Sequence, residues 1–257
     1  MQPSYSVVTG ASRGLGETFA RALAAQRGNL VLIARSKKPL EALARELRLS
    51  HAIQVIPFDV DLTSHPAGQQ LARELEAREL RVDLLVNNAG FGARGEFWEL
   101  TFERQLEMIR LNSEAVVNLT FHLLPMILEN RGGIINVASV AGFQPIPYAI
   151  VYAATKAFLM NFSLGLEHEL RPYGVRVVTL CPGRIRGDST TEGARDQRCK
   201  MHGIFQSREI IVREALRALD RGGGMVVPGV VNKVSVFAQR LIPRRIVPKL
   251  VARLSRT

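Results

Sequence analysis

Short apolar runs alternate with longer amphipathic segments from one end of this chain to the other, and this pattern limits the fold more than any other feature. Runs rich in Val, Ile and Leu predict strands at Tyr5–Val8, Asn29–Ala34, Ala52–Pro57, Val82–Val86, Gly133–Val137, Val175–Leu180 and Met225–Val227. Helical periodicity predicts helices near 14–27, 38–49, 66–79, 101–130, 152–171 and 208–221. Because strands that are apolar on both faces need helices on each side, we expect an α/β fold with a doubly wound parallel sheet.

The length and composition predict a soluble protein with a single globular domain. Of 257 residues, 47% are hydrophobic and 22% charged, which excludes wholesale disorder. No linker divides the chain, so we expect a catalytic domain at 1–232 and a short extension at 233–257. We expect neither a disulfide framework nor a metal site, because there are two cysteines and five scattered histidines. No signal peptide or apolar run of about 18 residues is evident, so we expect a cytoplasmic protein.

The net charge of +11 is concentrated at the C-terminal end. The tail after residue 232 carries seven basic residues and no acidic one, which leaves +4 for the rest. It shows no nucleic-acid reading motif, so we expect no nucleic-acid partner. Its apolar residues recur every three to five positions, which leaves two alternatives. The tail packs against the core or a neighbouring subunit, or it makes peripheral contact with an anionic membrane. Pro243 and Pro248 are expected to break it into short helices.

A glycine-rich turn follows the first predicted strand and leads directly into a helix. Three glycines with the spacing G-x3-G-x-G allow the backbone to approach a pyrophosphate, and the helix start offers free N–H groups and a positive dipole end. The spacing differs from G-x-G-x-x-G, but the position between strand and helix favours a dinucleotide site over a plain tight turn. The predicted cofactor-binding residues here are Gly10, Ser12, Arg13, Gly14, Leu15 and Gly16.

The end of the second predicted strand indicates which dinucleotide binds. A site for NAD usually has an acidic residue about 20 positions after the turn, where it binds the ribose 2′-hydroxyl. Here Arg35 stands 19 residues after Gly16, and Arg13 lies in the turn itself. Either arginine can pair with a 2′-phosphate, so the sequence favours NADP(H) as the cofactor.

A tyrosine and a lysine four residues apart indicate acid–base chemistry. Tyr152 and Lys156 lie on one face of a predicted helix. Free tyrosine has a pKa of about 10, and a cation about 4 Å away at an effective dielectric of about 20 would lower it by up to about 3 units. Ser139 ends a predicted strand 13 residues before Tyr152, at the sheet edge where such folds bind ligands. Asn87–Gly90 closes another strand at that edge, and Asn112 lies in the following helix.

Together these motifs resemble the short-chain dehydrogenase/reductase family, in its smaller NAD(P)-using branch, over about residues 4–227. The resemblance implies a Rossmann-type sheet of seven strands. It implies that Tyr152 exchanges the proton, that Ser139 holds the substrate oxygen, that Lys156 lowers the tyrosine pKa and binds the nicotinamide ribose, and that Asn112 anchors a relay water. The further cofactor-binding residues that it implies are Asp61, Leu62, Asn88, Ala89, Gly90, Pro182, Gly183 and Ile185, with Asp59-Val60 as an alternative to Asp61-Leu62.

The chain departs from the family pattern at the part of the site that contacts nicotinamide, and the resemblance does not identify the substrate. The family often has a threonine four positions after Pro182-Gly183. This chain has Gly187, so Ser189, Thr190 or Thr191 takes that contact or it is absent. Residues 184–207 are expected to form the substrate loop, either as a solvated flap or as a lid with contacts to acidic substrates. A Val-Pro-Gly turn and Leu/Arg-rich tail resemble a mostly uncharacterised bacterial subgroup.

These observations predict an NADP(H)-dependent oxidoreductase that acts on a small-molecule carbonyl or secondary alcohol. Phe143, Ile146, Pro147 and Tyr148 are expected to line the pocket, which favours a largely hydrophobic substrate. The alternatives are an NAD-dependent alcohol dehydrogenase and a non-catalytic NADP sensor. The resemblance further implies a homodimer or homotetramer through the helices at 101–130 and 152–171. Cys181 is expected to be a packed strand residue rather than a nucleophile.

Overall fold

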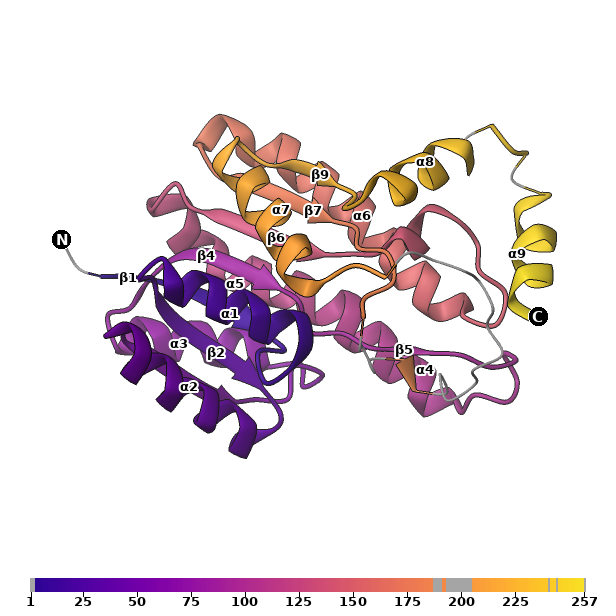
Figure 1. Cartoon of the computed structure of the whole chain (residues 1–257). Coiled ribbons are helices and arrows are strands. Elements are labelled where there is room, and N and C mark those ends of the chain that lie inside the picture. Colours follow the sequence, from indigo (N-terminus) through magenta and orange to yellow (C-terminus); the bar gives the residue numbers. More distant parts are fainter. Residues whose placement is uncertain (1–2, 187–190, 193–204, 240, 244, 257) are drawn as a thin grey trace.

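The computed structural model describes residues 3–186, 191–192, 205–239, 241–243 and 245–256. Seven parallel strands form its main sheet, in the spatial order β3–β2–β1–β4–β6–β7–β9 (Figure 1). Their bounds are β1 Ser4–Thr9, β2 Asn29–Ala34, β3 Val55–Asp59, β4 Arg81–Asn87, β6 Gly133–Val137, β7 Arg176–Leu180 and β9 Gly224–Val226. The order reverses between β1 and β4, which places a crevice for ligands at the carboxyl ends of the central strands.

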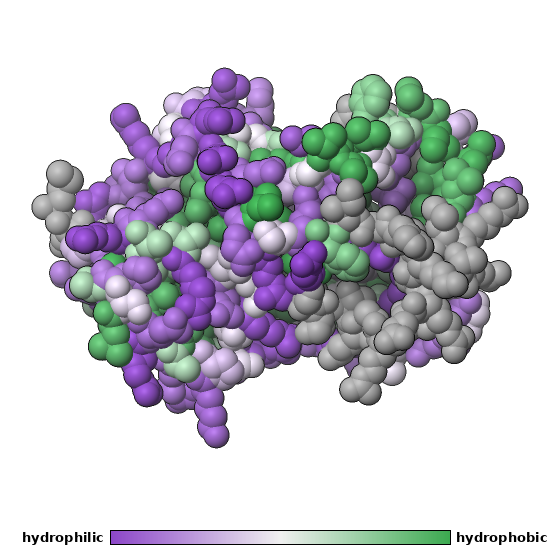
Figure 2. All heavy atoms as spheres, viewed as in Figure 1, coloured by the Kyte–Doolittle hydropathy of each residue, from purple (hydrophilic) through white to green (hydrophobic). Residues whose placement is uncertain are grey.

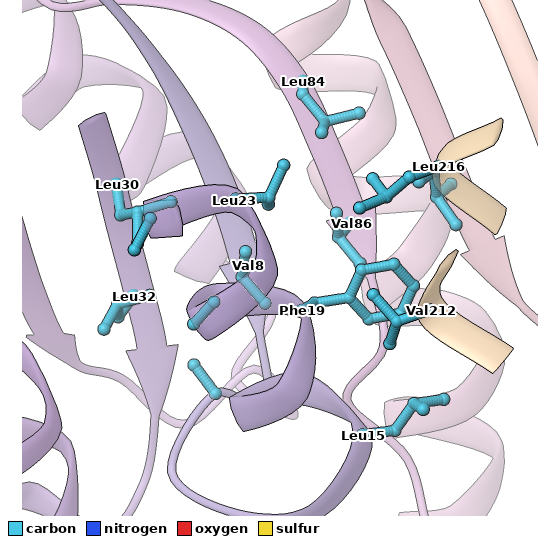
Figure 3. Close-up of a cluster of buried hydrophobic side chains, with 14 of the residues drawn as sticks. Val8, Leu15, Phe19, Leu23, Leu30, Leu32, Leu84, Val86, Val212 and Leu216 are labelled. Atoms are coloured by element: carbon cyan, nitrogen blue, oxygen red, sulfur yellow. The ribbon is translucent and has the colours of Figure 1, made fainter. Parts of the chain in front are cut away.

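Helices cover both faces of the sheet and bury two large apolar clusters. One face carries α1 (Gly14–Ala25), α2 (Lys37–His51) and α7 (Arg208–Asp220), and the other carries α3 (Ala67–Ala77), α4 (Phe102–Ile109), α5 (Ala115–Glu129) and α6 (Ile150–Leu170). Figure 3 shows Phe19 of α1 among Val8, Val86 and Val212. Because Phe19 is fully buried, it contributes about 2–3 kcal/mol and fixes α1, and with it the glycine-rich turn, on the sheet.

A long apolar helix runs along the second face. It consists of α4, a π-helical turn at Arg110–Glu114 and α5. By length and composition alone, Phe102–Glu129 meets the measure of a membrane span, and 39% of its most apolar window is buried. Core helices of globular domains meet the same measure, and here the helix packs against α3 and β4. The expectation that no segment of this length and hydropathy exists was therefore too strict.

Smaller elements complete the fold around the crevice. A two-stranded ribbon joins β5 (Gly92–Ala93) to β8 (Thr191–Glu192). Two short 3-10 helices lie at Val140–Phe143 and Arg171–Tyr173, and the chain ends in α8 (Val230–Gln239) and α9 (Val247–Arg256). The expected boundary between residues 232 and 233 lies inside α8. Pro243 separates α8 from α9 as expected, whereas Pro248 lies in the first turn of α9, where no N–H is needed.

The structure confirms the predicted α/β class and the seven-stranded, doubly wound sheet, with one strand displaced. The prediction of a strand at Ala52–Pro57 is wrong at both ends, because β3 spans Val55–Asp59. Helix α2 continues to His51, and Ala52 takes a left-handed conformation with φ 53° that caps the helix. An apolar run that spans a helix end and a strand start does not reveal the boundary between them, so the strand begins later than the hydropathy indicates.

Candidate active site

A cleft of about 1060 Å³ opens along the carboxyl ends of the central strands. It brings together most of the predicted site residues, which come from segments as far apart in the sequence as Gly10 and Ile185. The predicted residues that line it are Gly10, Ser12, Arg13, Gly14, Leu15, Arg35, Leu62, Asn88, Ala89, Gly90, Ser139, Tyr152, Lys156, Pro182, Gly183 and Ile185. Gly16, Asp61 and Asn112 are not among its lining residues.

The glycine-rich turn is built so that no side chain enters it. Gly10 and Gly14 have φ values of +64° and +63°, which side-chain-bearing residues rarely adopt. A Cβ atom on Gly16 would lie 2.2 Å from the carbonyl oxygen of Gly10 and 2.5 Å from Nδ2 of Asn88. The side-chain amide of Asn88 donates to the carbonyl oxygen of Thr9 at 2.8 Å, so it links the turn to the segment after β4.

Thr9 ties the turn to the neighbouring strand, and the sequence reasoning did not single it out. Its buried hydroxyl accepts from the backbone N–H groups of Asn88 and Ala89, both at 2.9 Å, and donates to the carbonyl oxygen of Val86 at 3.1 Å. The signal was a polar residue at the end of an otherwise apolar strand. Thr9 therefore fixes the position of two predicted cofactor-binding residues relative to the turn.

These features fit a dinucleotide cofactor. The space that a Cβ on Gly16 would fill keeps the turn tight, and α1 begins at Gly14 with its first N–H groups free of partners within the helix. A helix start of this kind binds anionic phosphate through N–H groups and the helix dipole. The cleft volume is at the upper end of the range for ligand sites. Gly10–Leu15 would hold the pyrophosphate.

Both arginines that the sequence singled out line the cleft: Arg35 follows β2, and Arg13 precedes α1. Arg35 Nη1 pairs with Oε1 of Glu107 at 3.0 Å, and Arg104 Nη1 contacts the other oxygen of that carboxylate at 2.6 Å. Arg13 is exposed at the cleft wall. Glu107 was not expected here, because it lies on α4, 72 residues from Arg35. In this structure Arg35, the predicted partner of a 2′-phosphate, is paired with a carboxylate.

Of the two residues predicted to contact adenine, Leu62 lines the cleft and Asp61 does not. Leu62 and Val60 line the cleft. The Asp61 carboxylate accepts from the backbone N–H and the hydroxyl of Thr63, at 2.9 and 2.8 Å. Burial raises the pKa of Asp61, but these hydrogen bonds and the charge of Arg35 hold it below its ordinary value. Both registers therefore contribute an apolar residue to the wall, and the role of Asp61 toward adenine stays a prediction.

Ser139, Tyr152 and Lys156 all line the cleft. Ser139 follows β6, and its Oγ accepts from Ala141 N at 3.1 Å. Tyr152 and Lys156 lie on α6, with Lys156 Nζ 5.9 Å from the centre of the tyrosine ring. A Cβ on Gly92 would lie 3.1 Å from that ring, so this glycine of β5 makes room for it. Sequence reasoning missed Gly92, whose only signal is its place two residues after Gly90.

Lys156 is buried and held by a backbone carbonyl. Its Nζ donates to the carbonyl oxygen of Val137 at 2.8 Å. Burial lowers the pKa of Lys156 to about 8, so the amine remains mainly protonated at neutral pH. Cys181 is packed and buried as expected, and burial raises the pKa of its thiol to about 12. The Cys181 thiol therefore stays protonated at neutral pH and does not act as a nucleophile. The charged group at this place in the site is the Lys156 ammonium.

Asn112 acts behind the cleft wall. It is fully buried in the π-helical turn, where Oδ1 accepts from Phe91 N at 3.1 Å. Its Nδ2 donates to Phe91 O at 2.9 Å and to Thr155 Oγ1 at 3.1 Å. Asn112 thus joins the segment after β4 to α6, between Tyr152 and Lys156. The implied role in holding a relay water stays a prediction.

A second buried polar chain connects the strands that carry the site. Asn136 Nδ2 donates to Ser163 Oγ on α6 at 2.9 Å, and Asn136 Oδ1 accepts from Asn87 Nδ2 at 2.8 Å. Asn87 also donates to Thr120 Oγ1 on α5 at 3.1 Å. Because buried polar groups need partners, this chain fixes the position of α5 and α6 on β4 and β6.

The prediction for the segment between Ser139 and Tyr152 was right for two of the four pocket residues and wrong for the other two. Ile146 and Tyr148 line the cleft, but Phe143 and Pro147 do not. Phe143 packs instead on the small cluster around Met160 and Cys181, because it is the last residue of a 3-10 helix that turns inward. Tyr148 has a left-handed φ of 66°, and its carbonyl oxygen accepts from Gly95 N at 2.9 Å.

The predicted threonine substitutes fall mainly outside the described part of the chain. Gly187, Ser189 and Thr190 lie outside the described residues, as does most of the expected substrate loop at 184–207. Thr191 belongs to β8, whose backbone pairs with Gly92. At the two ends of the loop, Ile185 pairs with Gln206 in a parallel bridge, so both ends are anchored beside Pro182-Gly183.

Comparison with known proteins agrees with this site. The short chain dehydrogenase family model matches residues 5–198. Among curated proteins, the chain is 33% identical to the ketoacyl reductase HetN of Nostoc sp. (strain PCC 7120), over 79% of this chain and 71% of the relative. It is 34% identical to the serine 3-dehydrogenase of Agrobacterium fabrum, over 72% of this chain and 73% of the relative.

Solved structures show the same architecture. A short-chain dehydrogenase from Sphingobium yanoikuyae in complex with NADPH superimposes with a TM-score of 0.81 at 31% identity, covering 93% of this chain and 94% of that one. The bulky-bulky ketone specific alcohol dehydrogenase from Comamonas testosteroni gives a TM-score of 0.78 at 27% identity, covering 96% and 100%.

Fold, cleft and the Ser139, Tyr152 and Lys156 group define a Rossmann-type oxidoreductase. The chain belongs to the short-chain dehydrogenase/reductase family. As a member of that family it is a nicotinamide-dependent oxidoreductase that acts on a small-molecule alcohol or ketone.

Proposed function

We propose that the protein is an NADP(H)-dependent reductase of a largely hydrophobic ketone. The observation that carries the proposal is the pair of arginines, Arg13 and Arg35, at the cleft end where NAD-binding relatives usually have a carboxylate. Reduction is the favoured direction because NADPH pools are kept reduced. Solved relatives in complex with NADPH or NADP are in keeping with this cofactor.

The lining of the cleft favours an apolar substrate. Val140, Ile146 and Val251 bring aliphatic side chains to the cleft wall, and Tyr148 and Phe205 add aromatic rings. Apolar walls with a few polar groups are typical of sites that bind hydrophobic small molecules. The similar alcohol dehydrogenase from Comamonas testosteroni is described as specific for bulky-bulky ketones. A ketone with substituents on both sides of the carbonyl is therefore the substrate class to test first.

The chain's own groups have separate tasks in this reaction. The nicotinamide, when bound, supplies or accepts the hydride. Ser139 Oγ is placed at the cleft wall to donate a hydrogen bond to the carbonyl oxygen, and Tyr152 to give that oxygen its proton. Lys156 keeps a positive charge beside the phenol, held in place by Val137 O. Asn112 and Thr155 hold the helix turn that carries both groups.

Removing one hydroxyl tests the chemistry. In Tyr152→Phe the ring still fits against Gly92, so we expect NADPH affinity to be retained. Turnover of bulky ketones should fall about 10²–10⁴-fold, because the proton donor is gone. The measurement is NADPH oxidation over a panel of ketones, aldehydes and 3-oxoacyl thioesters. Turnover by Tyr148→Phe, which removes a hydroxyl elsewhere in the cleft, should stay within about tenfold of the wild-type value. Equal losses of turnover in the two variants would show that Tyr152 is not the proton donor.

Cofactor choice is tested with paired charge changes. Arg35→Asp should weaken NADPH binding about tenfold or more and leave NADH binding nearly unchanged, because it removes the partner of the 2′-phosphate. Glu107→Gln should strengthen NADPH binding, since Arg35 no longer pairs with a carboxylate at 3.0 Å. Lys38→Asp on the outside of α2 is the control for net charge. An unchanged ratio of NADPH to NADH affinity in Arg35→Asp would show that Arg35 does not recognise the 2′-phosphate.

The same measurements address the sensor alternative. A protein that only senses NADP would bind NADPH but show no turnover over the whole panel, with Tyr152→Phe indistinguishable from the wild type. The intact Ser139, Tyr152 and Lys156 group favours the enzyme, because a sensor has no need of it.

We also propose that two copies associate through α5 and α6. Phe121, which is 71% exposed, and Val117 lie one helical turn apart on α5. Phe158 and Leu164 are exposed on α6, and Phe158 stacks on Phe162 at 6.1 Å. An apolar face of this kind on two adjacent helices is typical of a subunit interface.

A further inference from the structure

The C-terminal arm, which we define as α8, α9 and the turn between them, has an anchored face. On α8, Asn232 Nδ2 donates to Pro228 O at 2.8 Å and to Gln206 Oε1 at 3.1 Å, and Val236 is buried one turn later. On α9, Val247 is buried and Val251, again one turn later, lines the active-site cleft. These residues give each helix of the arm one side that is buried or turned to the cleft, and Figure 1 shows the arm at the edge of the molecule.

The other face of the arm is apolar and exposed. Val230, Val234, Phe237 and Leu241 recur at helical spacing and are between 61% and 75% exposed. Ile246, just before α9, and Leu250 on α9 are likewise exposed and lie four residues apart. Figure 2 shows the resulting apolar surface over α8 and α9, at the upper right of the view. Packing against the core therefore accounts for only one side of the arm.

The charges that the arm itself contributes beside this apolar face are all positive. Lys233, Arg245 and Lys249 are exposed beside it, and none of the three forms an ion pair with any residue that the structure describes. The chain contains no Asp or Glu after Asp220. An occupant of this face must therefore offer apolar groups together with negative charge.

We propose that the C-terminal arm docks the protein on an anionic lipid bilayer. A bilayer accepts the apolar side chains at the boundary of its acyl region and places anionic headgroups beside the lysines and arginines. The arm of a second copy would bring like charges together, which opposes pairing of arm with arm. Val251 on α9 lines the cleft from the anchored side of the arm, so docking through the exposed side leaves that contact in place. The proposal is independent of the reductase activity, since binding needs no turnover.

Vesicle flotation with the full chain tests the docking. Wild-type protein should float with vesicles of phosphatidylcholine and phosphatidylglycerol and not with phosphatidylcholine alone. Lys233→Gln/Arg245→Gln/Lys249→Gln should weaken this binding about a hundredfold, since each basic residue near an anionic surface contributes roughly fivefold. The matched control, Lys38→Gln/Arg45→Gln/Arg73→Gln, removes three exposed positive charges from α2 and α3 and should bind nearly as the wild type does.

A second pair of variants tests the apolar face. Val234→Ser/Phe237→Ser should weaken binding about tenfold or more and keep the thermal unfolding temperature, while Leu49→Ser/Trp98→Ser, at exposed apolar positions elsewhere, should leave binding unchanged. Failure of the wild type to float at low salt, or equal losses with arm and control variants, would overturn the proposal. So would a change in the solution mass of Val234→Ser/Phe237→Ser without vesicles, because the occupant would then be a second copy.

Discussion

At the scale of single residues, Lys156 carries the largest electrostatic cost in the site. Its side chain is buried and donates to one carbonyl oxygen, and burial lowers its pKa from 10.5 to about 8. A protein accepts such a cost where the charge is needed for function. The arrangement therefore makes both stability and turnover depend on the protonation of one amine.

The cost predicts a pH-dependent stability with a defined sign. The pKa of Lys156 is lower in the folded chain than in the unfolded chain, so between about pH 8 and 10.5 the unfolded chain binds more protons and stability rises with pH. The free energy of unfolding of the wild type should thus gain about 1–2 kcal/mol relative to Lys156→Met between about pH 7 and pH 9.5. Cys181 acts in the opposite direction, because its pKa is raised to about 12 in the folded chain and the unfolded thiol ionises first, but this effect is present in both proteins and largely cancels in the comparison. Urea unfolding at each pH measures the difference, and parallel curves would contradict the assignment.

At the scale of elements, the turn between β1 and α1 depends on glycines that have different tasks. Gly10 and Gly14 take left-handed conformations, whereas Gly16 is helical and is excluded from bearing a side chain only by its neighbours. Its hypothetical Cβ lies against a backbone oxygen, which cannot move without opening the turn. The conformation of the turn and the support from Asn88 therefore form one unit.

Two glycine-to-alanine variants in helices should have opposite effects. Gly16→Ala should lower the unfolding free energy by about 1–3 kcal/mol and weaken binding of NADPH, because the methyl group would lie 2.2 Å from Gly10 O. Gly165→Ala on α6 meets nothing within 4 Å and should raise stability by about 0.5–1 kcal/mol. Thermal unfolding and a fluorescence titration with NADPH measure both effects. Equal destabilisation by the two variants would show that close packing at Gly16 is not the cause.

At the scale of the whole molecule, the apolar faces lie on different parts of the surface and call for different partners. The faces of α5 and α6 belong to the catalytic domain, and the arm itself carries positive but no negative side chains. We expect the first to associate with a second copy and the second with anionic lipid. Two separate surfaces allow a dimer to bind a membrane without losing its interface.

A charge on α5 tests the dimer. Phe121→Glu should convert the dimer to a monomer, because a carboxylate would be buried without a partner in the interface. Light scattering coupled to gel filtration measures the mass, with Leu49→Glu as a control at an equally exposed position. A wild type that is monomeric at micromolar concentration, or a dimer that persists in Phe121→Glu, would contradict this interface.

The sequence predicted most of the fold because its signals are local. Strand runs such as Asn29–Ala34 and Gly133–Val137 coincide with β2 and β6, since two buried faces leave an uninterrupted apolar run. The short β5–β8 ribbon was missed, because two residues per strand produce no periodicity. The assignment of Phe143 to the pocket failed for another reason. Hydropathy indicates that a side chain is buried, but it does not indicate on which side of its segment the side chain packs.

The sequence by itself determined the order of strands and helices, the glycine-rich turn, and the residue types at Ser139, Tyr152 and Lys156, because each depends on local spacing or on the chemistry of one side chain. Only the tertiary structure decided that Glu107 pairs with Arg35, that Thr9 fixes Asn88 and Ala89, and that the two faces of the arm differ. These contacts join residues far apart in the chain, and which of them meet depends on how helices and strands pack in three dimensions.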